Sequence, residues 1–199
     1  MKKNLYQCPD IHRQVIVILL IYMMWNSSAP CLPSVSSSVG NDENQLYLIT
    51  KKISENLPEG FKLRVQPRFY GTPDAKLENG TIFDYIDGAG ENYIRHGFTS
   101  VAHIVLENSA GDRITVDVYD LSSNRNAQDA FEDENICAPR SSPLDPGIPL
   151  QAKVYSYTPD YMLYFVENRF LIHINLDNDA FKDKAEVLSA QIVKIINEE

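Results

Sequence analysis

Residues 101–120 read VAHIVLENSAGDRITVDVYD, and this stretch decides the fold class of the chain. Apolar and polar side chains alternate on both sides of the segment 108–112, which is rich in turn-forming Asn, Ser, Gly and Asp residues. Such alternation predicts half-buried strands, because successive side chains of a strand point to opposite faces. The stretch therefore predicts an antiparallel hairpin, whose inner face carries Ala102, Ile104, Leu106, Ile114, Val116 and Val118.

Further strands are predicted downstream, over residues 152–157, 161–167 and 170–176. These segments are rich in aromatic and β-branched side chains, and short polar turns separate them. The first two segments carry an aromatic band: Tyr155, Tyr157, Tyr161, Tyr164 and Phe165. This band is either a binding surface for a sugar, a peptide or a protein partner, or the ordinary filling of a sheet that helices cover.

Three segments have the apolar period of amphipathic helices. The first is marked by apolar residues at steps of three and four: Leu46, Ile49, Ile53 and Leu57. The second covers 123–134 and the third covers 179–196, whereas 66–80 is predicted to be a loop because it holds several prolines and glycines. We expect an α+β fold in which an antiparallel sheet of about five strands packs against N-terminal, central and C-terminal helices.

The segment 81–98, TIFDYIDGAGENYIRHGF, combines acidic, aromatic and glycine residues more densely than any other part of the chain. In a helix its three carboxylates would lie on one side: Asp84, Asp87 and Glu91. Gly88 and Gly90 disfavour an unbroken helix, because glycine costs about 1 kcal/mol relative to alanine in a helix interior. Two glycines within one turn predict a break, a bend or a backbone that another group approaches closely.

The structural interpretation of this segment is that Asp87 caps a second short helix starting near Gly88, with Glu91 in its first turn at the favourable end of the helix dipole. The functional interpretations are a divalent-cation site and an acid/base centre in which His96 partners the carboxylates. The carboxylate spacing does not match a calcium loop, and it selects no reaction. The residues that we assign to binding are Tyr85, Asp87, Glu91, Tyr93, Tyr155 and Tyr157.

Two histidines and one cysteine are the remaining candidates. His103 and His173 lie on strand faces opposite the core rows, where they are either hydrogen-bonded spacers or, together with His96, ligands of a metal. Cys137 follows the helix predicted over 123–134, where the dipole disfavours a thiolate, so a buried or idle thiol is expected. We predict neither a metal site nor a cofactor.

The N-terminal residues differ in composition from the rest of the chain. Basic residues precede the uncharged apolar run 15–25, which is typical of a signal peptide and shorter than the ~20 residues of a membrane-spanning helix. An uncleaved N-terminal anchor is the alternative interpretation. Cys31 suggests a lipoprotein, whereas Pro30 and Ser28 beside it argue against lipidation.

The chain is therefore divided into a signal peptide or N-terminal anchor (1–31), a flexible tether (32–44) and a single α+β domain (45–199). The formal net charge is −9, and removal of 1–31 leaves 15 basic and 26 acidic side chains, a net charge of −11. Such an acidic domain repels nucleic acid and anionic lipid headgroups. We expect an unknown small molecule or protein as its partner, no nucleic acid, and membrane contact only through the N-terminal segment.

Four separated blocks of the chain are IFDYIDGAGENYIRHGF (82–98), RITVDVYDL (113–121), AQDAF (127–131) and MLYFVENRFLIHI (162–174). In this order they resemble an uncharacterised family of exported bacterial proteins that is catalogued as a domain of unknown function. The resemblance covers about residues 55–197. It implies an export signal and an α+β domain, and it implies no activity.

The sequence thus predicts an exported protein, periplasmic or extracellular, with a non-enzymatic domain that binds a ligand or partner of unknown specificity. Its residues include no nucleotide-binding loop, no cysteine–histidine quartet and no nucleophile motif. The alternative is an acid/base enzyme of the hydrolase or isomerase type that uses the Asp84/Asp87/Glu91 cluster with His96.

Overall fold

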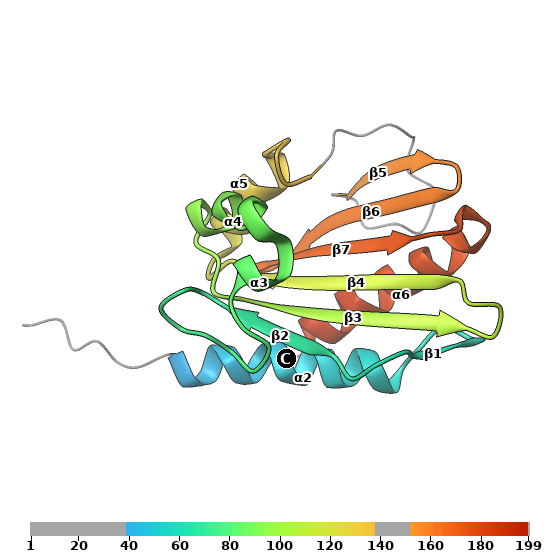
Figure 1. Ribbon diagram of the computed structural model, residues 1–199, viewed down its shortest axis with the longest axis horizontal. Helices are drawn as coiled ribbons and strands as arrows, with labels where there is room; N and C mark the ends of the chain where they lie inside the picture. The colour runs from blue at the N-terminus through green and yellow to red at the C-terminus, as the bar shows by residue number, and fades with distance from the viewer. Residues whose placement is uncertain (1–38, 138–151, 199) are drawn as a thin grey trace, which may run out of the picture. The chain divides into compact units, whose positions relative to one another are not determined.

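A seven-stranded antiparallel sheet forms the centre of the domain (Figure 1). The computed structural model describes residues 39–137 and 152–198, and within them the strand order is β1-β3-β4-β7-β6-β5, with β2 also paired to β3. The strands are β1 (Phe61–Leu63), β2 (Arg68–Gly71), β3 (Ser100–Asn108), β4 (Arg113–Asp120), β5 (Ala152–Tyr157), β6 (Asp160–Glu167) and β7 (Phe170–Leu176).

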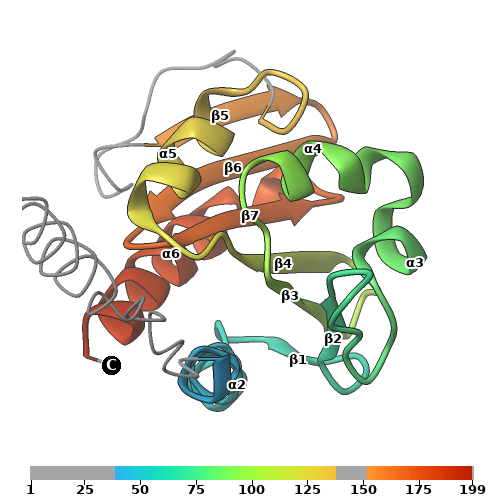
Figure 2. The ribbon, with the colours of Figure 1, turned by 90° about the vertical axis from the view of Figure 1, so that its left-hand side faces the viewer.

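One face of the sheet packs against two long helices, α2 (Val39–Glu55) and α6 (Lys182–Asn197), which Figure 2 shows on the same side. The inner row predicted for the hairpin is fully buried in this core. The apolar stripe of α2 is buried there too, at Leu46, Ile49 and Ile53. Removing these side chains from water is the main favourable contribution to folding.

The opposite face is partly covered by shorter helices. We call this face, which does not contact α2 and α6, the helix-bearing face, and the candidate site lies on it. These elements are α3 (Ile82–Ile86), the 3-10 turn η1 (Asp87–Ala89), α4 (Gly90–Arg95) and α5 (Asn124–Glu132). A further 3-10 turn, η2 (Asp179–Phe181), precedes α6. Figure 2 shows α3 and α4 on the side of the sheet away from α2 and α6, and Figure 1 shows them at one end of the strands.

The observed elements confirm the predicted α+β fold, including the hairpin, the later antiparallel strands and the three predicted helices, which are α2, α5 and α6. The sheet has seven strands rather than about five, because β1 and β2 both pair with the outer edge of β3. β2 lies inside the segment 66–80, so the prediction of a continuous loop there was wrong. Pro67 precedes β2 without harm, since a proline just outside an edge strand removes no hydrogen bond of the ladder.

The predicted tether is helical at its end, because α2 begins at Val39. The rest of the tether, residues 32–38, and the leader, residues 1–31, lie outside the described residues, as does most of the proline-rich segment after Cys137. In the part of the chain that the structure describes, no helix has the length and apolarity needed to cross a membrane.

The glycine-rich segment breaks as its composition predicts, into α3, η1 and α4. The backbone nitrogen of Thr81 donates to Oδ2 of Asp84 at 2.8 Å, which caps the start of α3. Gly90 is buried where α4 approaches α3, so that a Cβ atom would lie 3.1 Å from Cγ2 of Ile82 and 3.1 Å from Cδ1 of Phe83. The close approach that two glycines suggested is therefore observed at Gly90, whereas a Cβ atom at Gly88 would meet nothing within 4 Å.

Candidate functional site

A row of polar side chains crosses the helix-bearing face of the sheet. Residues in direct cross-strand register have neighbouring side chains on the same face. The register places six such residues in succession, which we call the polar row: Arg68, His103, Asp117, His173, Tyr164 and Lys153. A second core lies between the helix-bearing face and the helices α3, α4 and α5. The next residues toward α3 and α5, such as Tyr119 and Leu171, are buried in this second core. The polar row therefore follows the border of the covered part of the face.

His103 and Asp117 form the closest polar contact of this row. Nδ1 of His103 lies 2.7 Å from Oδ1 of Asp117, and the side chains are 19% and 13% exposed. The hydroxyl of Tyr85, from α3, lies 3.0 Å from the same Nδ1 and also bonds Asp117. A carboxylate oxygen can accept from both donors, so Asp117 holds the imidazole and the phenol together.

Three tyrosine hydroxyls continue this network into the second core. Tyr119 is hydrogen-bonded to Tyr85 and Tyr93, and the rings of Tyr93 and Tyr119 stack with centroids 4.3 Å apart. Burial raises the pKa of all three phenols well above the usual value, because the charged phenolate would lose its hydration. The hydroxyls thus keep their protons at neutral pH and serve as hydrogen-bond donors.

His173 lies on the other side of Asp117 and is held in a different state. Its ring makes an edge-to-face contact with the ring of Tyr164, with the two ring centroids 4.6 Å apart, and its Nε2 lies 3.7 Å from Sγ of Cys137. Burial lowers the pKa of His173 to about 4 and raises the pKa of the Cys137 thiol to about 12. Both shifts favour the neutral form at pH 7, so a thiolate–imidazolium pair is disfavoured, and the structure confirms that the thiol is buried.

Beside the polar row, on the side away from α3, lies a strip of five residues whose side chains are exposed or half-buried. We call it the open strip, and in strand order it is Val105, Thr115, Asn175, Met162 and Tyr155. Asn175 is exposed and the other side chains are half-buried. In Figure 1 this end of β3, β4 and β7 extends beyond α3 and α4. The strip offers apolar contact at both ends and polar groups in its middle.

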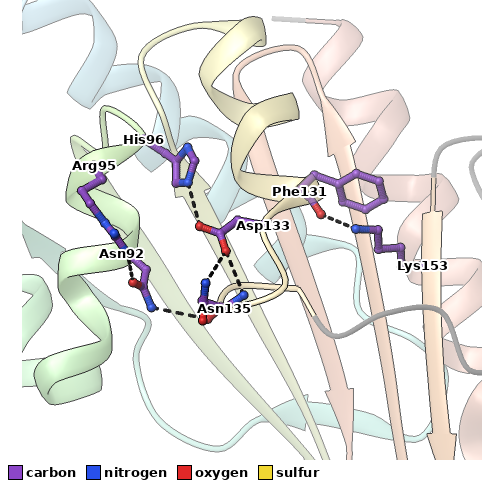
Figure 3. A network of polar contacts seen from close by, with 7 residues as sticks. All are labelled: Asn92, Arg95, His96, Phe131, Asp133, Asn135 and Lys153. Atoms are coloured by element: carbon purple, nitrogen blue, oxygen red, sulfur yellow. Dashed lines mark hydrogen bonds and ion pairs between the residues drawn. The ribbon is translucent and has the colours of Figure 1, made fainter.

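A separate network ties α4 to the chain that follows α5 (Figure 3). Nε2 of His96 lies 3.0 Å from Oδ2 of Asp133, whose Oδ1 accepts from the backbone and side-chain nitrogens of Asn135 at 2.9 and 2.8 Å. Arg95 donates to Asn92, which in turn donates to the carbonyl of Asn135. These bonds fix the helices that cover the face, and they leave His96 with a structural partner.

Lys153 closes the polar row at β5 and joins it to α5. Its Nζ donates to the carbonyl of Phe131 at 2.6 Å and lies 4.5 Å from the centre of that ring (Figure 3). An ion pair with Glu132 adds a second contact at 3.3 Å. A cation at the C-terminal end of a helix satisfies its free carbonyls and interacts favourably with the dipole.

The residues that the sequence assigned to binding lie in several different places in the structure. Tyr85 and Tyr93 belong to the hydroxyl network, and Tyr155 belongs to the open strip. Tyr157 is 71% exposed at the end of β5, and Asp87 and Glu91 are exposed. The aromatic band does not form one surface, because Tyr161 and Phe165 point into the core with α2 and α6.

The acid/base centre built on Asp84, Asp87, Glu91 and His96 does not have the required geometry. Asp84 is used as a helix cap, and its hydrogen bonds to Thr81 keep its pKa below the usual value. His96 bonds Asp133 instead of these carboxylates. Among the side chains that the structure describes, within residues 45–137 and 152–198, no three His, Cys, Asp or Glu residues are placed to hold a metal ion.

Sequence reasoning placed His103 and His173 on the correct face but missed the role of Asp117. The signal was present in the hairpin, because His103 and Asp117 stand seven residues before and after Ala110 at the centre of the turn. Equal distances from the turn make them cross-strand partners, as the register confirms. Tyr85 was assigned to binding, but no local pattern indicated that it would meet His103 and Asp117.

Two hollows on the described surface lie away from the polar row. One, of about 390 Å³, lies between α2 and the start of the sheet and includes Thr50 and Ser54. Their hydroxyls donate to helix carbonyls, at 2.8 Å in each case. The other, of about 420 Å³, lies between α2 and α6 and is lined mainly by charged residues at helix ends. Neither hollow gathers polar groups from several elements as the polar row does.

Comparison with known proteins gives a likeness of fold. The structure is similar to the crystal structure of the extracellular domain of PknH from Mycobacterium tuberculosis, with 11% sequence identity, 79% of this chain and 97% of that chain covered, and a TM-score of 0.47. No protein-family model matches the chain. A search of curated proteins gave no match either.

Proposed function

We propose that this domain is a non-enzymatic ligand- or partner-binding module of an exported protein, and that the ligand lies on the open strip against the polar row. One observation carries the proposal. The His103–Asp117 pair and Tyr85 form a hydrogen-bonded group, contributed by separate elements, beside a half-buried strip of mixed apolar and polar side chains. Ligand sites combine apolar surface with a small number of fixed polar groups.

Binding is favoured over catalysis by the state of the groups around the row. The buried phenols hold their protons, and both Cys137 and His173 are neutral at pH 7. Such groups orient a ligand through hydrogen bonds and support a rigid surface. A nucleophile or a poised acid needs a pKa shifted toward the working pH, and these shifts go the other way.

Export is proposed from the composition of the N-terminal residues. Basic side chains followed by an apolar run of about eleven residues suit a signal peptide. Cell fractionation and mass spectrometry of the N-terminus test this part. Recovery from the periplasm or medium with a shortened N-terminus is expected, whereas a cytosolic chain that retains Met1 would contradict it.

The binding part is tested by screening the isotope-labelled full chain with a fragment library and following its backbone amide resonances. Bound fragments are expected to shift the resonances of β3, β4 and β7 around the open strip. Asn175→Lys places a long charged side chain in the middle of the strip and should abolish these shifts. Val187→Lys is the matched control, because Val187 is 51% exposed on α6, on the other side of the sheet. Fragment shifts that survive Asn175→Lys, or that cluster elsewhere, would refute the site.

A further inference from the structure

The hydrogen bonds of His103 determine what its free nitrogen can recognise. Because Asp117 accepts from Nδ1, the neutral imidazole carries its proton on Nδ1 and a lone pair on Nε2. Among the residues that the structure describes, none is hydrogen-bonded to Nε2, and the His103 side chain is 19% exposed. A ligand that reaches this nitrogen must therefore donate a hydrogen bond, from a hydroxyl or an N–H group.

The other histidines in the described residues do not offer such a group. Nε2 of His96 is bound to Asp133 in the network that joins α4 to the end of α5. Nε2 of His173 faces the thiol of Cys137 under the second core. His103 thus differs from both in having a carboxylate on one nitrogen and a free lone pair on the other, next to the open strip.

The open strip adds two hydrogen-bonding groups and three apolar ones. The hydroxyl of Thr115 and the amide of Asn175 both donate and accept, and they occupy the middle of the strip. Val105 lies at one end, and Met162 and Tyr155 at the other. With strands about 4.8 Å apart, these five positions span roughly 19 Å. This length suits a short chain of linked rings better than a single small molecule.

Charge further restricts the class of ligand. The five residues of the open strip carry no formal charge, and the chain as a whole carries −9, which disfavours anions. Of the two cations of the polar row, Lys153 is paired with Glu132, and Arg68 lies on β2, beyond the β3 end of the strip. Asp117, the carboxylate of the polar row, accepts from His103 and Tyr85 and is only 13% exposed, so a cationic ligand has little access to it. A neutral molecule with several hydroxyl groups and an apolar face matches the groups that the strip offers.

We infer that the site of the proposed function binds a neutral carbohydrate oligomer, with sugar hydroxyls donating to Nε2 of His103 and exchanging hydrogen bonds with Thr115 and Asn175. The apolar faces of the sugar rings pack on Tyr155 and Met162. An aromatic ring provides apolar area at low entropic cost, which suits the C–H face of a pyranose. The inference rests on the proposed binding function and names its ligand.

The test uses the full chain and isothermal titration with three sets of probes. They are neutral oligomers of glucose and of N-acetylglucosamine, the matching uronic-acid oligomers, and uncharged tetrapeptides. At least one neutral oligosaccharide is expected to bind, and the uronic-acid oligomers should bind at least about tenfold more weakly. Asn175→Ala and His103→Phe should each raise the Kd of the sugar by about tenfold, the loss expected for one hydrogen bond.

Asn197→Ala is the control, because Asn197 is exposed at the end of α6, and α6 packs on the opposite face of the sheet from the open strip. Asn175 is also exposed, so its variant should keep the unfolding midpoint of the parent chain. Peptide binding that Asn175→Ala weakens, without any sugar binding, would overturn the carbohydrate inference and leave the proposed function standing. If no probe binds, or if the Kd of the sugar is the same for the parent chain and for both variants, the inference and the assigned strip are both overturned.

Discussion

Nδ1 of His103 lies 2.7 Å from Oδ1 of Asp117, directly across the β3–β4 ladder. The exposed pair of Glu107 and Arg113, on the same two strands, is looser, at 3.6 Å and with the arginine side chain 47% exposed. Solvent screens the outer pair more strongly, so the inner pair contributes more to the structure. The same carboxylate also accepts from Tyr85, which links the sheet to α3.

Asp117→Ala should destabilise the domain by about 1–3 kcal/mol, because it leaves the partly buried donors of His103 and Tyr85 without their acceptor. Urea unfolding measures this change, and nitrogen-15 shifts of the His103 ring should show that the proton no longer stays on Nδ1. Asp129→Ala is the control, since the pair of Asp129 with Arg125 is exposed and should be worth less than about 0.5 kcal/mol. Equal stability of the two variants would contradict the role of Asp117.

Gly90→Ala should destabilise the domain and Gly88→Ala should not, although the residues stand two positions apart. The new methyl group at position 90 would lie 3.1 Å from both Ile82 and Phe83, so we expect a loss of about 1–3 kcal/mol from overpacking. At position 88 it would meet nothing within 4 Å, and the reduced freedom of the unfolded chain should leave stability unchanged or raised by up to ~1 kcal/mol. Thermal and urea unfolding compare the pair directly. A neutral Gly90→Ala would show that α3 and α4 do not pack as closely as described.

The stability of the α4–α5 connection should depend on acid. Hydrogen bonds from His96 and then from Asn135 lower the pKa of Asp133 from 3.8 to about 2 in the folded state. Because the folded value is the lower one, this contribution is complete above about pH 4 and is lost as the pH falls toward 2.

His96→Leu removes the largest cause of that shift, because leucine has no donor, so the variant should lose less stability between pH 4 and pH 2 than the parent chain does. Urea midpoints across this range, with a carboxyl titration of Asp133 by NMR, measure the difference. Parallel pH profiles for parent and variant would refute the contact between His96 and Asp133.

Cys137 should be unreactive in the folded protein. The thiol is fully buried, and burial raises its pKa to about 12, so little thiolate exists at pH 8. Iodoacetamide should label Cys137 only after denaturation, and peptide mass mapping separates this residue from Cys8 and Cys31 in the N-terminal segment. Rapid labelling of the native chain at Cys137 would show that the second core opens there.

Much of the fold could be read from local pattern. The alternation in 101–120 fixed the hairpin, its turn and the face that carries His103, and the helical stripe of Leu46, Ile49 and Ile53 fixed the burial of α2. These features follow from the period of side chains along a strand or helix, which each segment expresses alone. β2 was missed because a strand of four residues at a sheet edge shows almost no period.

The candidate site depended on contacts between distant segments. Asp117 and His173 are neighbours only because β7 pairs with β4, and no residue near either one encodes that pairing. Tyr85 meets Asp117 only after the glycine break has turned α3 over the sheet. The acidic cluster that stood out in the sequence proved to be a cap and exposed residues, because adjacency along the chain does not make side chains converge.

By itself, the chain's order of apolar and polar residues determined that there would be strands, helices and a two-sided sheet, and which side chains would face the core. It also determined an acidic composition and an N-terminal apolar run. Only the tertiary structure decided which strands lie side by side, and hence that Arg68, His103, Asp117, His173, Tyr164 and Lys153 form one row. The physical reason is that side-chain period is a local property, whereas strand order is settled by the burial of both sheet faces at once.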